Sequence, residues 1–336
     1  MSQGLALSVI VATHNRAGKL RVTLEALEGQ ETPSGLEWEV LVVDNGSTDH
    51  TLEEFRRAAM RTPGRFRYMF EPRLGKSRAL NLGLKVARGG VVALTDDDVS
   101  PARDWVATAA TILDRLKVDG AGGRILPRWE VEAPEWLLRS RRLLDTLAIM
   151  DYDKPTMLPI PLGTHPQVWG ANMVYRRSAL AALDGFDPNL GPVGGRRYCS
   201  EDRDIVRRML AAGFAMAYDP GLTVYHRVPR ARLRRAYFRR AMWDMGEGDA
   251  LAATTPPRGR CICGVPIRSL VFLAKFAVES SLHSMARRPG AFDQVLDWTY
   301  HAGFTWGLFT HARIRRREGQ GPRTAPATAP AIRAPH

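Results

Sequence analysis

Three consecutive carboxylates, Asp96, Asp97 and Asp98, follow the apolar run VVALT at residues 91–95. Like charges at this spacing repel one another, and burying them is unfavourable unless a positive charge lies among them. The pattern therefore has two interpretations, an ordinary solvated acidic turn or a site for a divalent cation. Aspartate oxygens are hard ligands that suit Mg²⁺ or Mn²⁺, and phosphate oxygens usually complete such a site. The second interpretation predicts a nucleotide diphosphate beside the aspartates.

The aspartates end the last of four short apolar segments that alternate with helical periods in the first hundred residues. Strands are predicted at 8–13, 39–44, 66–70 and 91–95, and helices at 18–28, 51–60 and 76–87. Short, continuously apolar strands separated by helices predict an α/β fold with a parallel sheet covered on both faces. Ligands bind beyond the carboxyl ends of the strands in such sheets. Polar residues gather at these ends, at 13–15, 44–45 and 96–98.

The later part of the chain is less regular. Helices are predicted at 104–116 and at 200–214, the second with acidic residues in its first turn, and AMAYD and TVYH are predicted strands. From Arg230 the chain is basic and is predicted to be helical, and its last eighteen residues are rich in proline and alanine. We expect that end to be disordered.

The charge is strongly positive, +13 with a pI near 10.2, and it is concentrated in the last third of the chain. Residues 227–317 contain seventeen Lys and Arg against six Asp and Glu. Such a surface suits an anionic partner. RARLRRAYFRRAMW and SLVFLAKFAVESSLHSMARR interleave basic and apolar residues, and two interpretations stay open. These helices either lie on an anionic membrane surface or pack on the rest of the protein with their arginines in water.

Three cysteines, at 199, 261 and 263, are too few for a disulfide framework and poorly spaced for a structural zinc. The N-terminal LALSVIVA lacks a basic flank and a cleavage site, so it predicts a strand rather than a signal peptide. No apolar run is long enough to span a membrane. We therefore expect a cytoplasmic protein, with a peripheral position on the inner face of the plasma membrane as the second option.

Five segments resemble those of the inverting family 2 glycosyltransferases with the GT-A fold, in the same order and at similar spacing over residues 7–227. They are VIVATHNRAGKL, VVDNGSTDHT, GKSRALNLGL, LTDDDV and SEDRDIVRRMLAAGF. The resemblance implies a Rossmann-like mixed sheet that binds a nucleoside diphosphate sugar. It also implies sugar transfer to a hydroxyl group with inversion, typical of cell-surface polysaccharide or glycolipid assembly. The acceptor would be a glycan or a lipid-linked molecule.

The resemblance assigns donor-binding roles to residues at the strand ends. Asp44 and Asn45 correspond to the positions that contact the base and ribose, and His14, next to Thr13, corresponds to one that stacks on the base. Many relatives have Asp where this chain has Asn45, so the base preference is open, with a UDP-sugar as the favoured donor. Lys76 begins a helix after a glycine, where it can meet phosphate, and Arg78 is a weaker candidate.

The resemblance also divides the acidic residues by role. Asp98 and His226 correspond to ligands of the Mg²⁺ or Mn²⁺ ion, Asp96 to a ribose or metal contact, and Asp97 to a ligand or a structural residue. Glu201 and Asp202 correspond to the family's Glu–Asp pair. Asp202 is the predicted base that deprotonates the acceptor hydroxyl, and Glu201 orients the acceptor or the surroundings of Asp202. Simple helix capping and core packing are the alternatives for the acidic pair and for His226.

We therefore expect a nucleotide-sugar-binding half at 1–115, an acceptor and catalytic half at 116–229, a basic helical region at 230–318 and a disordered tail at 319–336. A sugar-phosphate nucleotidyltransferase is a rival, but VATHNRAGKL lacks the glycine-rich loop of that class. The other rival is a non-catalytic protein that binds nucleotide sugars or anionic surfaces. Nucleic acid is not an expected partner, because the basic region lies outside the motifs and has no RNA-binding signature. RRAMW lacks the glutamine of the processive synthases, so we expect single sugar additions.

Overall fold

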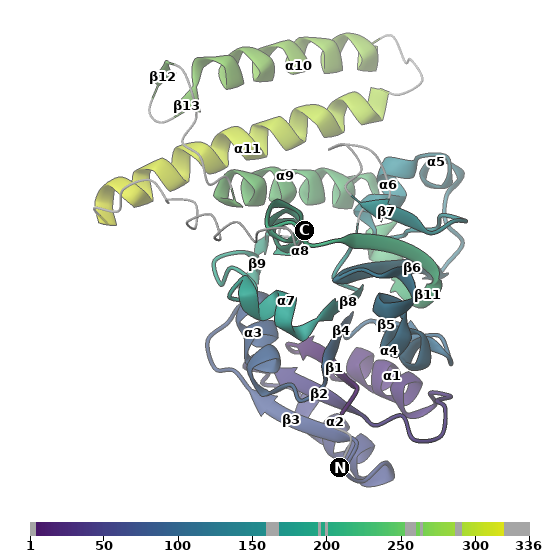
Figure 1. Ribbon diagram of the computed structural model, residues 1–336. Coiled ribbons are helices and arrows are strands. Elements are labelled where there is room, and N and C mark those ends of the chain that lie inside the picture. Colours follow the sequence, from purple (N-terminus) through teal and green to yellow (C-terminus); the bar gives the residue numbers. More distant parts are fainter. Residues whose placement is uncertain are drawn as a thin grey trace, which may run out of the picture. The chain divides into compact units, whose positions relative to one another are not determined.

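The computed structural model describes residues 5–158, 168–193, 196–198, 201–252, 260–262, 265–285 and 291–318. The chain divides into two compact units, whose elements are labelled in Figure 1. The first unit comprises Met1–Gly195 with Glu201–Tyr237, and the second comprises Arg196–Ser200 with Phe238–His336. The predicted disordered tail and two of the cysteines, at 199 and 263, lie outside the described residues.

The first unit is built on a nine-stranded mixed sheet with the order β3-β2-β1-β4-β8-β6-β11-β5, in which β7 also pairs with β11. The four predicted strands form its parallel half, as β1 (Leu7–Thr13), β2 (Trp38–Asp44), β3 (Phe66–Phe70) and β4 (Val91–Asp96). Consecutive residues of β1, such as Val9 and Ile10, are fully buried, as expected for a strand covered on both faces. The predicted α/β fold is therefore confirmed.

The second half of the sheet contains mostly antiparallel pairs. Its strands are β5 (Val99–Pro101), β6 (Gly120–Trp129), β7 (Thr156–Leu158), β8 (Asn172–Arg176) and β11 (Met216–Val228). β8 runs antiparallel to both β4 and β6, whereas β11 is parallel to β6. The segments AMAYD and TVYH, predicted as two strands, are one strand here. β11 continues through Pro220 and Gly221 with an irregular register between Asp219 and Thr223.

Among the described residues of the first unit, five helices lie close to predicted positions, and three short ones, at 135–138, 141–146 and 177–182, were not predicted. The helices are α1 (Ala17–Glu28), α2 (Thr51–Arg61), α3 (Lys76–Val86), α4 (Trp105–Leu116), α5 (Glu135–Leu138), α6 (Arg141–Thr146), α7 (Arg177–Ala182) and α8 (Glu201–Ala211). Apolar residues of α3, α7 and α8 pack with those of β1, β2, β4 and β8 in one buried cluster. α4 lies against β8 and β11, and its Trp105 Nε1 donates a hydrogen bond to Asn172 Oδ1 at 2.8 Å.

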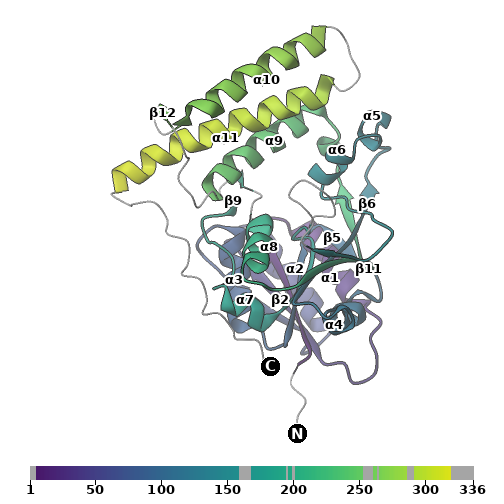
Figure 2. The same ribbon diagram turned by 45° about the horizontal axis from the view of Figure 1, so that its top comes forward.

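Short elements complete the list: β9 (Gly191–Val193), β10 (Arg196–Tyr198), the 3₁₀ turn η1 (Arg230–Arg232), β12 (Cys261–Ile262) and β13 (Val265–Pro266). The second unit is mainly helical, with most of α9 (Arg235–Ala252), α10 (Ile267–Met285) and α11 (Ala291–Glu318), which run side by side in Figures 1 and 2. α9 and α11 approach closely at glycines, because a Cβ on Gly246 would lie 2.1 Å from the Tyr300 carbonyl oxygen. Among the described helices, none carries an apolar stretch long enough to cross a membrane.

Candidate active site

The turn between β4 and β5 carries the three aspartates, and two of them are buried. Asp97 and Asp98 are 3% and 7% exposed, whereas Asp96 is half-buried. Asp97 accepts hydrogen bonds from Thr13 Oγ1 and from Arg16 Nη1, both at 2.8 Å. Burial raises the pKa of Asp97 to about 6, while the charge of Arg16 opposes that rise. The interpretation as an ordinary solvated turn does not describe this arrangement.

Asp98 lies at the centre of a group of positively charged side chains. Its Oδ2 faces Lys19 Nζ at 3.2 Å, Arg232 Nη2 at 3.4 Å and Arg16 Nη1 at 3.6 Å, and its Oδ1 lies 3.7 Å from His226 Nε2. Burial alone would raise the pKa of Asp98, but the imidazole and the three cations around it lower that pKa below its ordinary value. Asp98 is therefore ionised at neutral pH.

His226 reaches this carboxylate because β11 pairs antiparallel with β5, which places His226 opposite Val99. Burial lowers the pKa of His226, although the charge of Asp98 opposes the effect, so the imidazole is neutral at pH 7. Oxygen and nitrogen ligands lie about 2 Å from a bound divalent ion, so two donor atoms 3.7 Å apart can share one ion. Asp98 Oδ1 and His226 Nε2 therefore fit Mg²⁺ or Mn²⁺. Within the described residues, no group of three or more acidic, His or Cys side chains is arranged for a metal.

Lys76 begins α3, and its side chain joins two acidic groups. Its Nζ lies 2.9 Å from Asp96 Oδ1 and 3.4 Å from Glu201 Oε1. Burial would lower the pKa of Lys76, but the carboxylates around it raise that pKa well above its ordinary value. The ammonium group therefore stays charged, and it connects the end of β4 with the start of α8.

Glu201 and Asp202 form the first turn of α8 and are buried, at 2% and 7% exposure. Asp202 Oδ2 accepts a hydrogen bond from the amide of Gly170 at 2.7 Å. Only glycine permits this approach, because a Cβ at position 170 would lie 2.5 Å from Asp202 Oδ1. Oδ1 itself accepts no hydrogen bond from the part of the chain that the structure describes. A buried carboxylate oxygen without a donor is unfavourable, and such an atom is a natural contact for a ligand.

The two adjacent carboxyl groups ionise differently. Burial and the charge of Asp202 raise the pKa of Glu201 to about 8. Burial also raises the pKa of Asp202, but there the charge of Lys76 opposes the shift. The two groups titrate as a pair, and the raised pKa of Glu201, about 8, favours Glu201 as the site of a proton that they share.

The end of β2 holds the residues expected to contact a base and ribose. Asp44 is buried, and its carboxylate accepts hydrogen bonds from the Ser47 amide at 2.8 Å and from the Tyr68 hydroxyl at 2.6 Å. His14 is exposed at the end of β1, with its Nδ1 2.7 Å from the carbonyl oxygen of Asn45. Asp44 thus fixes the turn after β2, whereas the ring of His14 is open to solvent.

Asn45 uses its side chain to hold the loop that leads into α3. Its Nδ2 donates to the carbonyl oxygens of Glu71 at 3.0 Å and Arg73 at 2.8 Å, and its Oδ1 accepts from the amide of Gly75 at 2.7 Å. The position of Lys76 therefore depends on Asn45. This structural role was not expected from the sequence, where Asn45 is a predicted base contact.

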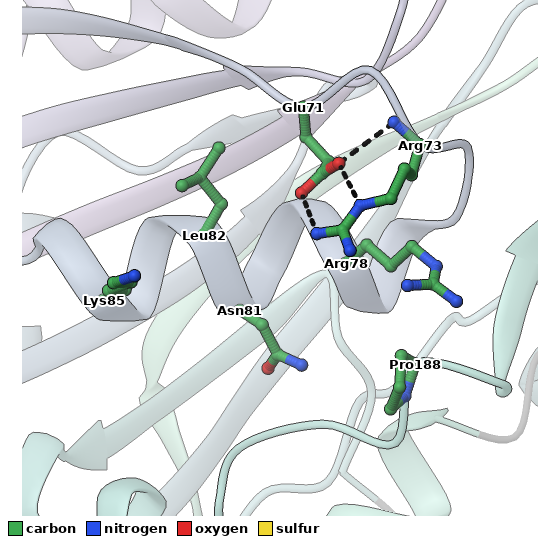
Figure 3. A pocket seen from close by; sticks show the side chains of 7 residues that line it. All are labelled: Glu71, Arg73, Arg78, Asn81, Leu82, Lys85 and Pro188. Atoms are coloured by element: carbon green, nitrogen blue, oxygen red, sulfur yellow. Dashed lines mark hydrogen bonds and ion pairs between the residues drawn. The ribbon is translucent and has the colours of Figure 1, made fainter.

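Arg78 follows Lys76 by two positions on α3 and is drawn in Figure 3. It lines a surface pocket of about 330 Å³ together with Glu71, Arg73, Asn81, Leu82, Lys85 and Pro188. Arg73 is held there by ion pairing with Glu71, at 3.0 Å from Nε to Oε1. The structure thus brings Lys76 to Asp96 and Glu201, but it does not bring Arg78 to them.

Four residues of this site were not among the predicted ones. Arg16 and Lys19 lie within VIVATHNRAGKL, three positions apart at the start of α1, so a helical periodicity of basic residues was a usable signal. Arg232 and Gly170 have no such signal. Each contacts a site residue that the fold places beside it. The sequence around Arg232 and around Gly170 does not mark either residue as part of the site.

A model of glycosyl transferase family 2 matches residues 8–184, slightly more than half of the chain. The chain belongs to glycosyl transferase family 2. The family resemblance predicted from the five sequence segments is therefore confirmed.

The matches to curated relatives cover only part of each relative's length. Glycosyltransferase AglE of Haloferax volcanii is 31% identical over 119 residues, 35% of this chain and 39% of that protein. The pre-mycofactocin glycosyltransferase of Mycobacterium tuberculosis is 27% identical over 254 residues, 75% of this chain and 48% of that protein. The chain thus spans less than half the length of these relatives.

Solved structures share the fold across nearly the whole chain. The mannosyltransferase PcManGT from Pyrobaculum calidifontis, in complex with GDP-Man and Mn²⁺, has a TM-score of 0.57 at 21% identity and covers 95% of this chain and 89% of its own. TarS from S. aureus, in complex with UDP, has a TM-score of 0.52 at 16% identity and covers 94% and 92%. The predicted GT-A fold is therefore confirmed.

Proposed function

We propose that this family 2 member transfers a sugar from a nucleoside diphosphate donor to a hydroxyl acceptor, in a metal-dependent single displacement with inversion. The observation that carries this proposal is the buried Asp202 Oδ1, which has no hydrogen-bond donor among the described residues. It belongs to the residue that follows Glu201, and Lys76 connects Glu201 to Asp96 at the end of β4. A base and a diphosphate-binding region are the two parts that the reaction needs.

Asp202 is the proposed base. The acceptor hydroxyl gives its proton to Oδ1 while the hydroxyl oxygen forms the new bond to the anomeric carbon, and the bond from that carbon to the diphosphate breaks. Gly170 holds the other oxygen, Oδ2, at 2.7 Å, so Asp202 is fixed in orientation. With the shared proton on Glu201, Asp202 would be ionised and able to accept the proton of the acceptor.

The leaving diphosphate meets several positive charges in this proposal. The basic side chains of Lys76, Arg16, Lys19 and Arg232 surround Asp96 and Asp98. A divalent ion bound to Asp98 and His226 would offset negative charge on the departing diphosphate. The solved neighbours with GDP-Man and Mn²⁺ and with UDP support a nucleotide-sugar donor and a metal. Thr13, Asp44 and His14 would lie along the base and ribose, and a UDP-sugar is the donor we favour.

We further propose that the acceptor is a glycan or a lipid-linked molecule of cell-surface polysaccharide or glycolipid assembly, met at the cytoplasmic face of the membrane. Support comes from α10, where Ile267, Leu270, Val271 and Val278 are exposed on one side of the helix. The exposed Arg268 and Lys275 flank this apolar stripe, and no acidic residue occurs between 267 and 278. An apolar face bordered by cations suits an anionic lipid surface.

A donor panel tests the reaction itself. The full chain is incubated with UDP-, GDP- and dTDP-sugars, Mn²⁺ and a mixture of glycan and polyprenyl-phosphate acceptors, and nucleoside diphosphate release is followed. We expect release with one nucleotide and dependence on Mn²⁺. Release of pyrophosphate from a sugar phosphate and a nucleoside triphosphate would instead identify a nucleotidyltransferase. Binding of a nucleotide sugar without turnover under any condition would favour a non-catalytic binding protein.

A further inference from the structure

Arg232 lies between the two side chains that fit a divalent ion. Its Nη1 lies 3.1 Å from His226 Nε2, and its Nη2 lies 3.4 Å from Asp98 Oδ2. One guanidinium therefore contacts both predicted metal ligands at once. The three side chains are well buried, at 17%, 6% and 4% exposure for Arg232, His226 and Asp98, so water competes weakly for these contacts.

The contact with His226 identifies which nitrogen carries the lone pair. A guanidinium can only donate hydrogen bonds, so Nε2 of His226 is the acceptor and is not protonated. The same lone pair would bind a metal ion. Asp98 Oδ1, which would be the second ligand, lies 3.7 Å from the same nitrogen. Arg232 therefore uses the electron pair that a divalent ion would need.

We propose that Arg232 holds Asp98 and His226 in place of the divalent ion, and that it moves to the diphosphate when the ion and the nucleotide bind together. This inference rests on the proposed function, because it assigns Arg232 to the same metal and donor site. It makes Arg232 a positioning residue in the ion-free protein and a diphosphate contact in the loaded one. The planar guanidinium group of Arg232 suits both roles, since such a group binds carboxylate or phosphate with parallel hydrogen bonds.

The local charges explain why the exchange needs both ligands. Asp97 and Asp98 are surrounded by Arg16, Lys19 and Arg232, so three cations already face two carboxylates. A dication arriving alone would add positive charge and would have to displace Arg232 into solvent. A diphosphate brings the compensating negative charge and a new partner for the displaced guanidinium. Ion and nucleotide must therefore bind cooperatively, and the coupling must be reciprocal.

Mn²⁺ binding to the full chain tests this inference without measuring activity. Free Mn²⁺ is followed by its electron paramagnetic resonance signal, first alone and then with saturating UDP or GDP. Arg232→Gln removes the competing cation, so we expect Mn²⁺ alone to bind about tenfold more tightly than to wild type, within the usual range of coupling between sites. With saturating nucleotide, the gain in Mn²⁺ affinity of Arg232→Gln over wild type should be smaller, because the variant lacks the contact between Arg232 and the diphosphate. UDP or GDP without metal should bind the variant more weakly.

Two matched variants separate this exchange from a general charge effect. Lys19→Gln removes a cation from the same carboxylate but leaves His226 bound to Arg232, so its gain in Mn²⁺ affinity should be smaller than that of Arg232→Gln. Arg234→Gln removes an exposed charge two residues away and should change neither affinity. Arg232→Lys keeps the charge but cannot bridge both groups, so its Mn²⁺ affinity should lie between those of wild type and Arg232→Gln. It replaces Arg232→Gln in the test if Arg232→Gln does not fold.

The outcomes distinguish the inference from the proposed function. Mn²⁺ affinity that is unchanged or lower in Arg232→Gln, or equal gains in Arg232→Gln and Lys19→Gln, would overturn the role of Arg232. Sugar transfer by wild type without any bound Mn²⁺ would overturn both the metal dependence and the exchange. The expected affinity pattern in a chain that turns over no donor would support the exchange and refute the transferase proposal.

Discussion

Glu201 and Asp202 are neighbours in sequence, yet different contacts act on their two carboxyl groups. Burial and the adjacent charge raise the pKa of Glu201 to about 8, so it keeps its proton at neutral pH. Asp202 has an amide donor at one oxygen and the charge of Lys76 nearby, and these oppose the effect of its burial. Residues that look equivalent in the sequence thus acquire different chemistry from a few contacts.

A pH-dependent stability follows from Glu201. Its pKa is higher in the folded chain than in the unfolded one, so its contribution to stability is fully present below the unfolded pKa, near 4.3. That contribution is lost as pH rises towards about 8, at up to about 1.4 kcal/mol per pH unit. Glu201→Gln cannot ionise, so its unfolding free energy should fall less between pH 5 and 8 than that of wild type. Urea unfolding at several pH values measures the two slopes.

Glu135→Gln is the matched control for this measurement, because Glu135 is exposed and its change should leave the slope as in wild type. Equal slopes for wild type and Glu201→Gln would mean that Glu201 is already ionised at pH 5. The assignment of the shared proton to Glu201 would then be wrong.

At the scale of elements, the predicted strands and helices of the first hundred residues are found within a few residues of their expected bounds, because their apolar periodicity is strong. The carboxyl ends of β1, β2 and β4 meet at one edge, as the parallel pairing requires. β11 differs from its prediction. Pro220 and Gly221 predict a break between two strands, but β11 pairs with β6 on both sides of these residues and is one strand. Tertiary pairing of this kind has no local signature.

The apolar stripe of α10 leads to a prediction at the same scale. Val271 and Val278 are 62% and 59% exposed on one side of the helix, so a paired change to Asp removes apolar contact and adds repulsion from anionic lipid. Wild type should sediment with phosphatidylglycerol vesicles and only weakly with phosphatidylcholine vesicles. The Val271→Asp, Val278→Asp variant should lose about tenfold or more in affinity for the anionic vesicles.

Met60→Asp is the matched control, since Met60 is also an exposed apolar residue, 74% exposed, but lies on α2. It should leave vesicle binding unchanged. Equal binding of anionic vesicles by wild type and the α10 variant would refute the proposal that α10 contacts a lipid surface. A wild-type dimer that the α10 variant abolishes, without lipid binding, would instead identify the stripe as a contact between two copies of the chain.

At the scale of the whole molecule, the sequence predicts the acidic half of the site better than the basic half. Asp96, Asp97 and Asp98 are contiguous, and Glu201 with Asp202 opens a well-marked helix, so both groups are visible as short patterns. Arg232 is one of 48 Lys and Arg residues, and only the fold selects it as the partner of Asp98 and His226.

Long-range packing accounts for the remaining differences. Asn45 fastens the loop before α3 through partners 26 to 30 positions away, and Gly170 meets Asp202 across 32 positions. The sequence identifies these residues only through the family resemblance or not at all, because neither contact leaves a periodic pattern. The roles that depend on bound ligands, such as those of Thr13, His14 and Asp44, stay predictions.

The most direct test of the account is the effect of Asp202→Asn on transfer and on donor binding, measured side by side. The asparagine keeps the shape and one hydrogen bond to Gly170 but cannot accept a proton as a base does. We expect the transfer rate to fall by about 10²- to 10⁴-fold while the donor affinity measured by calorimetry stays within a few fold of wild type. The exposed Asp153→Asn should match wild type in both measurements. A variant that transfers sugar at the wild-type rate, or that loses donor binding as Asp98→Ala should, would contradict the assignment of Asp202 as the base.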